Sequence, residues 1–219
     1  MEIAFLGNWS SNLEKGRRNV SLLVENKYVF DFGPHSLESL LEIGAHLYDI
    51  SAIFISHMHL DHYAGLSEFL WYRAMNEINS DIAIIGPTGI RENTEMLLKL
   101  MNTPTSMLDQ IRLHTRYVDG IENGNTIKVE KMIVQVFYGD HRIPDYGYRF
   151  ELNGKTAFYS GDTKYSQNIV IGAKGVDCLI HEMTYLDEDA EKTRYQKHST
   201  YSDVMTIFKE SGAKCLIPV

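Results

Sequence analysis

The sequence predicts an α/β protein, a layered sandwich of two mixed β-sheets with helices. β-rich stretches occupy both halves of the chain, and segments with helical spacing of apolar residues accompany them in each half. The chain has 219 residues and is 44% hydrophobic, so it can bury a large core. The sequence contains neither a low-complexity linker nor an internal repeat, and we therefore expect a single domain over residues 1–219.

The first half alternates strands with helices. Ala52–Ser56 is almost wholly apolar, which is typical of a short strand that is buried on both faces. The strands predicted in this half are Ile3–Leu6, Val20–Val24, Tyr28–Phe32, Ala52–Ser56 and Ile82–Ile85. The helices predicted from the spacing of apolar residues are Ser36–His46, Tyr63–Asn79 and Gly89–Met101.

The second half is richer in strands, which are joined by tight turns such as Asn153-Gly154. The strands predicted here are Thr126–Val129, Met132–Tyr138, Tyr146–Leu152, Lys155–Ser160, Asp177–Ile180 and Cys215–Val219. One helix is predicted over Ser199–Ser211, and it ends at Gly212, a residue type that commonly follows a helix.

The composition excludes several classes of protein. The chain has 21 basic and 29 acidic residues and therefore a net charge of −8. Such an acidic chain is a poor generic nucleic-acid binder, because that binding relies on Lys and Arg to neutralise phosphates. The two cysteines, Cys178 and Cys215, form no CxxC pair, so we expect no disulfide framework and a cytoplasmic location. The N-terminal segment lacks a basic region, and no apolar run approaches the ~20 residues that span a bilayer, so we expect no signal peptide and no membrane partner.

The most informative segment is Ser56–His62, in which three histidines and one aspartate follow the buried strand. In an extended chain His57 and His59 point the same way, because side chains alternate with a period of two. Asp61 and His62 then open the next helix and can face a neighbouring point. This segment therefore predicts ligands for two adjacent divalent metal ions, which we expect to be Zn²⁺, with Mn²⁺ or Fe²⁺ as alternatives.

The HxHxDH pattern of this segment resembles the hallmark of the metallo-β-lactamase superfamily. Gly139–His141 and Ser160–Thr163 each follow a strand and extend the resemblance over essentially the whole chain. The resemblance implies a four-layer αββα sandwich with the metals at one edge. It also implies that one metal is bound by His57, His59 and His141, the other by Asp61 and His62, and both by Asp162.

Five further segments resemble the ribonuclease Z branch and its related phosphodiesterases, such as phosphoribosyl cyclic phosphodiesterase. They are Leu6–Gly7, Arg17–Ser21, Gly147–Arg149, His181–Tyr185 and His198–Thr200. The chain departs from this pattern at Asn8-Trp9, where a Thr-Gly pair is usual. The tRNA-processing enzymes of the branch also carry a long arm, whereas Phe150–Ser160 leaves room for one hairpin only. The spacing therefore favours the armless phosphodiesterases and makes tRNA the less favoured substrate.

The resemblance also concerns the end of the given sequence. In this branch the last histidine ligand follows the final strand, which here is Cys215–Val219. We expect the ligand at the next position, with the chain truncated just before it. If this ligand is absent, His198 is the alternative ligand.

Together the motifs predict a metal-dependent hydrolase. Within that class we favour a dinuclear-zinc phosphodiesterase that uses a metal-bridging hydroxide on a small or nucleotide-like phosphodiester. The predicted catalytic residues are Asp61, His198 and Glu182. His198 is the candidate leaving-group acid or phosphorane stabiliser, and Glu182 would orient it. The residues predicted to bind substrate are Arg17, Arg18 and Tyr148.

Three other hypotheses stay open: a tRNA 3'-processing endoribonuclease like ribonuclease Z, a hydrolase of a lactone or thiolester, and a metal-binding module with a degenerate site. The resemblance implies a homodimer, because members of this branch often dimerise through helices near the active site.

Overall fold

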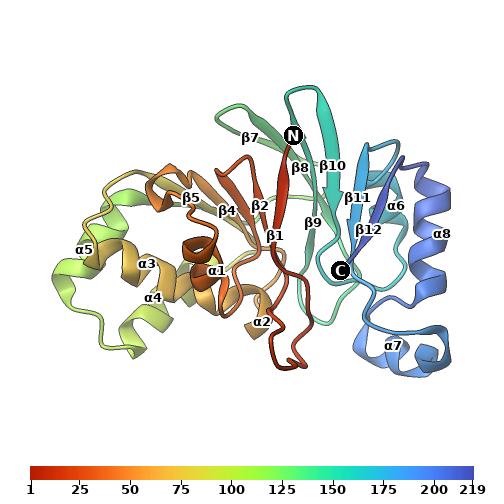
Figure 1. The fold of residues 1–219 in the computed structure, drawn as a ribbon, viewed down its shortest axis with the longest axis horizontal. Coiled ribbons are helices and arrows are strands. Elements are labelled where there is room, and N and C mark those ends of the chain that lie inside the picture. Colours follow the sequence, from red (N-terminus) through yellow and green to blue (C-terminus); the bar gives the residue numbers. More distant parts are fainter. The chain divides into compact units, whose positions relative to one another are not determined.

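The structure is a computed structural model that describes residues 1–219, apart from the side chain of Arg194. The chain divides into two compact units (Figure 1). Residues 2–120 form the N-terminal unit, and residues 121–219 together with Met1 form the C-terminal unit.

The N-terminal unit contains a six-stranded sheet whose strands follow one another in chain order. These strands are β1 (Ile3–Gly7), β2 (Ser21–Val24), β3 (Tyr28–Phe30), β4 (Ala52–Phe54), β5 (Ile82–Ile85) and β6 (Thr115–Val118). The first three are antiparallel, and β3 to β6 are parallel. Every residue of β2 to β5 is buried, as expected for strands covered on both faces.

Helices of the N-terminal unit gather beside this sheet (Figure 1). They are α1 (Ser36–Glu42), a 3₁₀ turn (Leu47–Asp49), α2 (Leu60–Tyr63), α3 (Gly65–Met75), α4 (Ile90–Leu100) and α5 (Thr105–His114). Phe69 of α3 packs on Phe32 with ring centroids 4.9 Å apart, within a core of buried Leu and Ile side chains. The helix predicted over Tyr63–Asn79 therefore corresponds to α3, with the short helix α2 before it.

The C-terminal unit contains a second six-stranded sheet, in the order β12-β11-β10-β9-β8-β7. Its strands are β7 (Thr126–Val129), β8 (Met132–Tyr138), β9 (Tyr146–Leu152), β10 (Lys155–Tyr159), β11 (Cys178–His181) and β12 (Leu216–Pro218). Strands β7 to β10 are antiparallel, and β10 to β12 are parallel. The turn between β9 and β10 places Asn153 and Gly154 at φ of 54° and 70°, the left-handed region that this residue pair favours.

Three helices belong to the C-terminal unit: α6 (Gln167–Gly172), α7 (Ala190–Gln196) and α8 (Tyr201–Ser211). A 3₁₀ turn over Asp187–Asp189 precedes α7. Thr200 and Asp203 form a capping box at the start of α8, and Gly212 ends it at a φ of 64°. Among the residues that the structure describes, no helix combines the length and apolar character needed to cross a membrane.

The predicted pair of mixed sheets with helices is confirmed, but four elements were not predicted. These are α5, β6, α6 and α7. Strand β6 lies at a sheet edge and no residue in it is fully buried, so its pattern carries no apolar signal. Helices α6 and α7 have six and seven residues, too few for a helical period to stand out.

Candidate functional site

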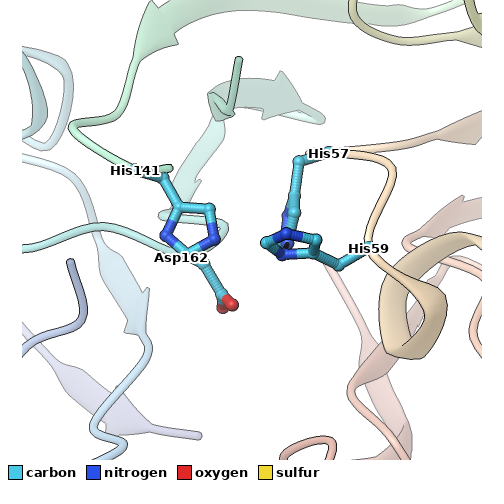
Figure 2. Close-up of side chains that lie close together, drawn as sticks. All are labelled: His57, His59, His141 and Asp162. Atoms are coloured by element: carbon cyan, nitrogen blue, oxygen red, sulfur yellow. Dashed lines mark hydrogen bonds between the residues drawn. The ribbon is translucent and has the colours of Figure 1, made fainter. Parts of the chain in front are cut away.

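The HxHxDH segment follows β4 and continues into α2 in the N-terminal unit. His57, Asp61 and His62 are buried and His59 is partly exposed. His57 Nε2 lies 2.9 Å from His59 Nδ1, and the two rings meet edge to face (Figure 2). Two ring nitrogens thus converge on one point, as the alternation of side chains along an extended chain predicts.

Asp31, which the sequence analysis did not single out, orients this segment. Its carboxylate is fully buried and accepts the Ser56 backbone N–H at 2.6 Å and the Ser56 hydroxyl at 2.8 Å. His62 Nδ1 lies 2.7 Å from Asp31 Oδ2, a distance at which it donates its proton. This leaves Nε2 of His62 with a lone pair, the arrangement typical of a metal-binding histidine with a carboxylate behind it. The signal in the sequence is an acidic residue inside the predicted apolar strand Tyr28–Phe32.

Two glycines allow the backbone after β3 to reach the metal motif. A Cβ on Gly33 would lie 1.8 Å from the Asp61 carbonyl oxygen, and one on Gly65 would lie 2.2 Å from the Gly33 carbonyl oxygen. The Phe32 N–H also donates to the His62 carbonyl at 2.7 Å. Side chains at either glycine would push this turn away from the strand that supports it.

In the C-terminal unit, His141 follows β8 and Asp162 follows β10. Candidate ligand atoms of these two residues lie within 4.8 Å of each other (Figure 2). The loops are joined by hydrogen bonds from the Asp140 N–H to Thr163 Oγ1 at 2.9 Å and from the Asp162 N–H to Asp145 Oδ1 at 3.2 Å. Burial lowers the pKa of His141, which favours the neutral imidazole that metals bind.

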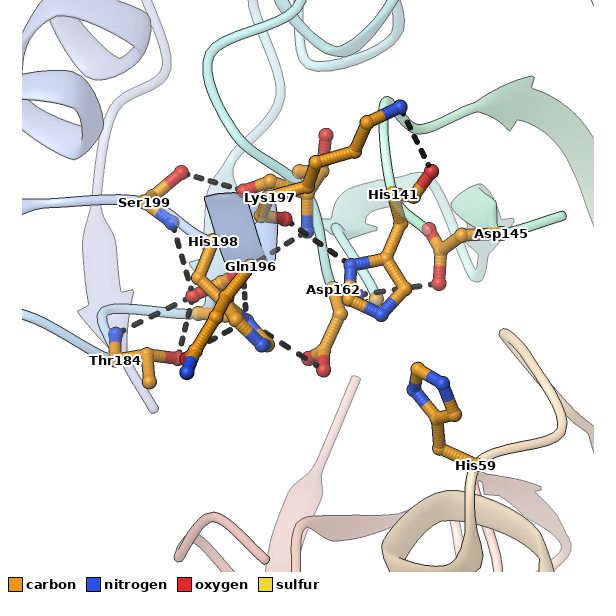
Figure 3. A network of polar contacts seen from close by, with 12 residues as sticks. His59, His141, Asp145, Asp162, Thr184, Gln196, Lys197, His198 and Ser199 are labelled. Atoms are coloured by element: carbon orange, nitrogen blue, oxygen red, sulfur yellow. Dashed lines mark hydrogen bonds and ion pairs between the residues drawn. The ribbon is translucent and has the colours of Figure 1, made fainter. Parts of the chain in front are cut away.

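His198 lies beside Asp162 (Figure 3), and the partly exposed ring of His198 contacts the buried Glu182 carboxylate. His198 Nδ1 lies 3.0 Å from Glu182 Oε1 and 3.7 Å from Asp162 Oδ2. The Glu182 carboxylate also accepts the Thr163 N–H at 2.9 Å and the Thr184 hydroxyl at 2.7 Å. The contact predicted between Glu182 and His198 is therefore present. It fixes the ring so that Nδ1 faces the carboxylate.

The residue types at the predicted ligand positions of each unit suit a divalent cation. The N-terminal unit offers ring nitrogens of His57, His59 and His62 with the Asp61 carboxylate, and the C-terminal unit offers His141 and Asp162. Asp162, Glu182 and His198 also bring ligand atoms within 4.8 Å of one another. Imidazole nitrogens with carboxylate oxygens suit Zn²⁺, Mn²⁺ and Fe²⁺ alike, so this donor set does not select one metal.

The three residues predicted to bind substrate have different surroundings in the structure. Arg18 makes two hydrogen bonds to the Glu42 carboxylate, at 2.6 and 2.8 Å, so its charge is already paired. Tyr148 is fully buried in β9 and exposes no surface to a substrate. Arg17 lies with its guanidinium 4.3 Å from the centroid of the Trp9 ring, at the edge of a groove that the Glu38 side chain also lines.

Comparison with known proteins places these residues in a family. Residues 1–217 match the family described as Anti-Pycsar protein Apyc1. Ribonuclease Z of Anoxybacillus flavithermus is 27% identical to the chain, over 99% of the chain and 85% of the relative. Ribonuclease Z of Ligilactobacillus salivarius is 28% identical with the same coverage.

Solved structures show the same fold. The short form of human tRNase Z superposes with a TM-score of 0.84 at 26% identity, covering 100% of this chain and 92% of that one. The metallo-β-lactamase fold protein YhfI from Bacillus subtilis gives a TM-score of 0.80 at 18% identity, covering 99% and 85%. These similarities confirm the predicted fold class and the predicted enzyme class. The chain belongs to the Anti-Pycsar protein Apyc1 family, and it is a metal-dependent hydrolase of the metallo-β-lactamase superfamily that resembles ribonuclease Z.

Proposed function

We propose that the protein is a phosphodiesterase that hydrolyses a small or nucleotide-like phosphodiester with the help of two zinc ions. The observation that carries this proposal is the contact of His198 with the buried Glu182 carboxylate beside Asp162, with Nδ1 of the histidine 3.0 Å from the carboxylate. A histidine held in this way can give a proton to an alkoxide leaving group, which departs poorly at neutral pH without one.

The proposed ligands are those that the family resemblance implies. His57, His59 and His141 would hold one ion, Asp61 and His62 the other, and Asp162 both. When bound, the ions polarise the phosphoryl oxygens and activate a water molecule for attack. Asp31 contributes from behind, because it keeps the proton of His62 on Nδ1 and so leaves Nε2 for the metal.

The other groups act on the leaving group. In this proposal His198 enters the reaction protonated, and Glu182 stabilises the positive ring through Nδ1. Nε2 then delivers its proton to the departing oxygen, and the neutral ring stays hydrogen-bonded to Glu182. Backbone N–H groups of Thr163 and Ser199 hold the Glu182 carboxylate in place, at 2.9 and 3.2 Å. The carboxylate therefore does not need to move during the proton transfer.

The lack of an inserted arm between β9 and β10 favours a small substrate over tRNA. The alignment with ribonuclease Z of Anoxybacillus flavithermus spans 274 positions, more than the 219 residues of this chain, so the relative holds segments that this chain lacks. Between β9 and β10 the chain forms only the tight turn at Asn153-Gly154. The net charge of −8 also disfavours a long polyanion.

A comparison of leaving groups in the His198→Ala variant tests the proposal. With a nucleotide diester that releases an alkoxide, we expect kcat to fall about 10²–10⁴-fold, the usual contribution of a general acid. With bis-(p-nitrophenyl) phosphate, whose leaving group departs without a proton, we expect a loss below about tenfold. His114→Ala, which alters a histidine outside every motif, is the matched control.

Two results would contradict the proposal. Equal losses of kcat on both diesters would show that His198 is not the general acid. If the metal-loaded protein leaves diesters intact but cleaves a thiolester or lactone, the proposed phosphodiesterase activity is wrong. Cleavage of a precursor tRNA would favour the ribonuclease Z alternative.

A further inference from the structure

Lys197 has an unusual backbone conformation for its residue type. It ends α7 at φ 59° and ψ 49°, in the left-handed region, and its N–H donates to the Thr193 carbonyl at 2.7 Å. This conformation costs a residue with a Cβ roughly 1 kcal/mol. Glycine would avoid this cost but lacks the side-chain contacts that Lys197 makes.

The main chain of Lys197 contacts the side chain of His141. The Lys197 carbonyl oxygen lies 3.1 Å from His141 Nδ1, a distance at which the ring donates its proton (Figure 3). A carbonyl can only accept, so this contact selects the tautomer with hydrogen on Nδ1. His141 Nε2 is then left with the lone pair that a metal needs.

The side chain of Lys197 returns to the same place. Its Nζ lies 2.8 Å from Asp140 Oδ1 and 3.2 Å from the His141 carbonyl oxygen. The main chain of Lys197 thus binds the side chain of His141, while the side chain of Lys197 binds the main chain of His141. Lys164 contacts the other oxygen of Asp140 at 3.0 Å.

The next residue extends this arrangement. His198 directly follows Lys197 and is held by Glu182 at 3.0 Å. A shift of Lys197 would therefore disturb both His141 and His198, whose rings lie 5.0 Å apart between centroids.

We infer that Lys197 is a positioning residue that fixes His141 in its metal-binding tautomer and orientation. The inference rests on the proposed function in one respect, namely that His141 binds a metal ion. Partners of this kind commonly contribute 10–100-fold to metal affinity. The ammonium holds the loop, and the left-handed backbone aims the carbonyl at the ring.

Two measurements on three variants test this inference. In metal-free wild-type protein, ¹⁵N NMR of the imidazole should show His141 protonated on Nδ1. In Lys197→Met we expect a mixture of tautomers and a Zn²⁺ dissociation constant, measured by chelator competition, that is about 10–100-fold weaker. Lys197→Arg should restore most of the affinity, because it keeps the positive charge.

Lys164→Met is the matched control. It removes an ammonium from the same Asp140 carboxylate without touching His141, so its Zn²⁺ affinity should stay within about threefold of wild type. Lys197→Gly, which suits the left-handed backbone, replaces Lys197→Met if the latter fails to fold. Its Zn²⁺ affinity should also fall.

The inference is overturned if wild-type His141 carries its proton on Nε2. It is also overturned if Lys197→Met, or its glycine replacement, binds Zn²⁺ as tightly as wild type, or if Lys164→Met loses as much affinity. Neither measurement uses a substrate. A protein that shows the expected affinities but cleaves no phosphodiester would retain the role of Lys197 and refute the proposed function alone.

Discussion

The two units hold their candidate ligands in different ways. In the N-terminal unit the ligands lie within the single segment His57–His62, whereas in the C-terminal unit His141 and Asp162 come from separate loops. The contiguous set needs one fully buried carboxylate, Asp31, to orient it. The dispersed set is held by hydrogen bonds between several loops. The Glu182 carboxylate alone accepts three of them, from Thr163, Thr184 and Ser199.

This difference suggests where each unit is sensitive. The support of the N-terminal ligands consists of buried backbone and a buried charge, so changes there should first reduce the free energy of unfolding. The support of the C-terminal ligands includes Lys197, whose side chain is 38% exposed. Changes there should first alter the protonation and the orientation of the ligand side chains.

The largest effect is expected from Gly33→Ala. Its Cβ would lie 1.8 Å from the Asp61 carbonyl oxygen, a backbone atom that cannot move without displacing the metal motif. We expect a loss of about 4 kcal/mol or more in the free energy of unfolding, measured by urea denaturation. Gly86→Ala is the control, because its Cβ would meet Ile55 at 3.3 Å and should cost about 1 kcal/mol. A cost for Gly33→Ala no larger than that of this control would show that the turn is not rigid.

The same contrast explains what could be predicted from the sequence. The HxHxDH segment and the buried strand before it were visible because their residues are neighbours in the chain. Glu182 and His198 were paired only through a family resemblance. Asp31 was missed because one acidic residue in an apolar strand has no periodicity to mark it.

Two further contacts were missed for a similar reason. Lys197 was missed because its contacts depend on a left-handed backbone, which nothing in a Gln-Lys-His sequence indicates. The contact of Arg18 with Glu42 was missed as well, because a basic loop carries no sign of a partner 24 residues away. Contacts between segments distant in the chain, rather than residue types, decided these cases.

Paired substitutions of the two supporting carboxylates sharpen the comparison. For Asp31→Asn we expect a loss of about 3 kcal/mol in the free energy of unfolding, because three short hydrogen bonds to a buried charge are disrupted. For Glu182→Gln we expect about 2 kcal/mol, because its side chain is slightly exposed and its hydrogen bonds are longer. Chemical denaturation of the metal-free variants would measure both losses.

The two variants should also differ in activity. After loading with Zn²⁺, Glu182→Gln should change the pH dependence of kcat, because the ring of His198 loses its negative partner. Asp31→Asn should instead weaken Zn²⁺ binding about 10–100-fold and leave that pH dependence unchanged. The proposed difference between the units is wrong if both variants change the pH dependence of kcat, or if both weaken Zn²⁺ binding to the same extent.

The smallest effect concerns acid sensitivity, which we assign to the C-terminal unit through His181. This residue is fully buried at the end of β11, and burial lowers its pKa, so it stays neutral in the folded protein. The unfolded chain takes up a proton near pH 6.5, and the folded chain does so only at lower pH. As the pH falls below about 6.5, the unfolded state therefore binds more protons and the free energy of unfolding decreases.

This linkage gives a measurable slope. We expect one buried histidine to contribute at most about 1.4 kcal/mol per pH unit, and about 1 kcal/mol between pH 7 and pH 5.5. In His181→Gln the part of the slope due to this residue should disappear, whatever the variant costs at pH 7. His46→Gln, a change at an exposed histidine, should keep the wild-type slope. If His181→Gln keeps the full slope as well, the buried ring is not the group that takes up the proton, and the acid sensitivity lies with the histidines of the N-terminal unit or with His141.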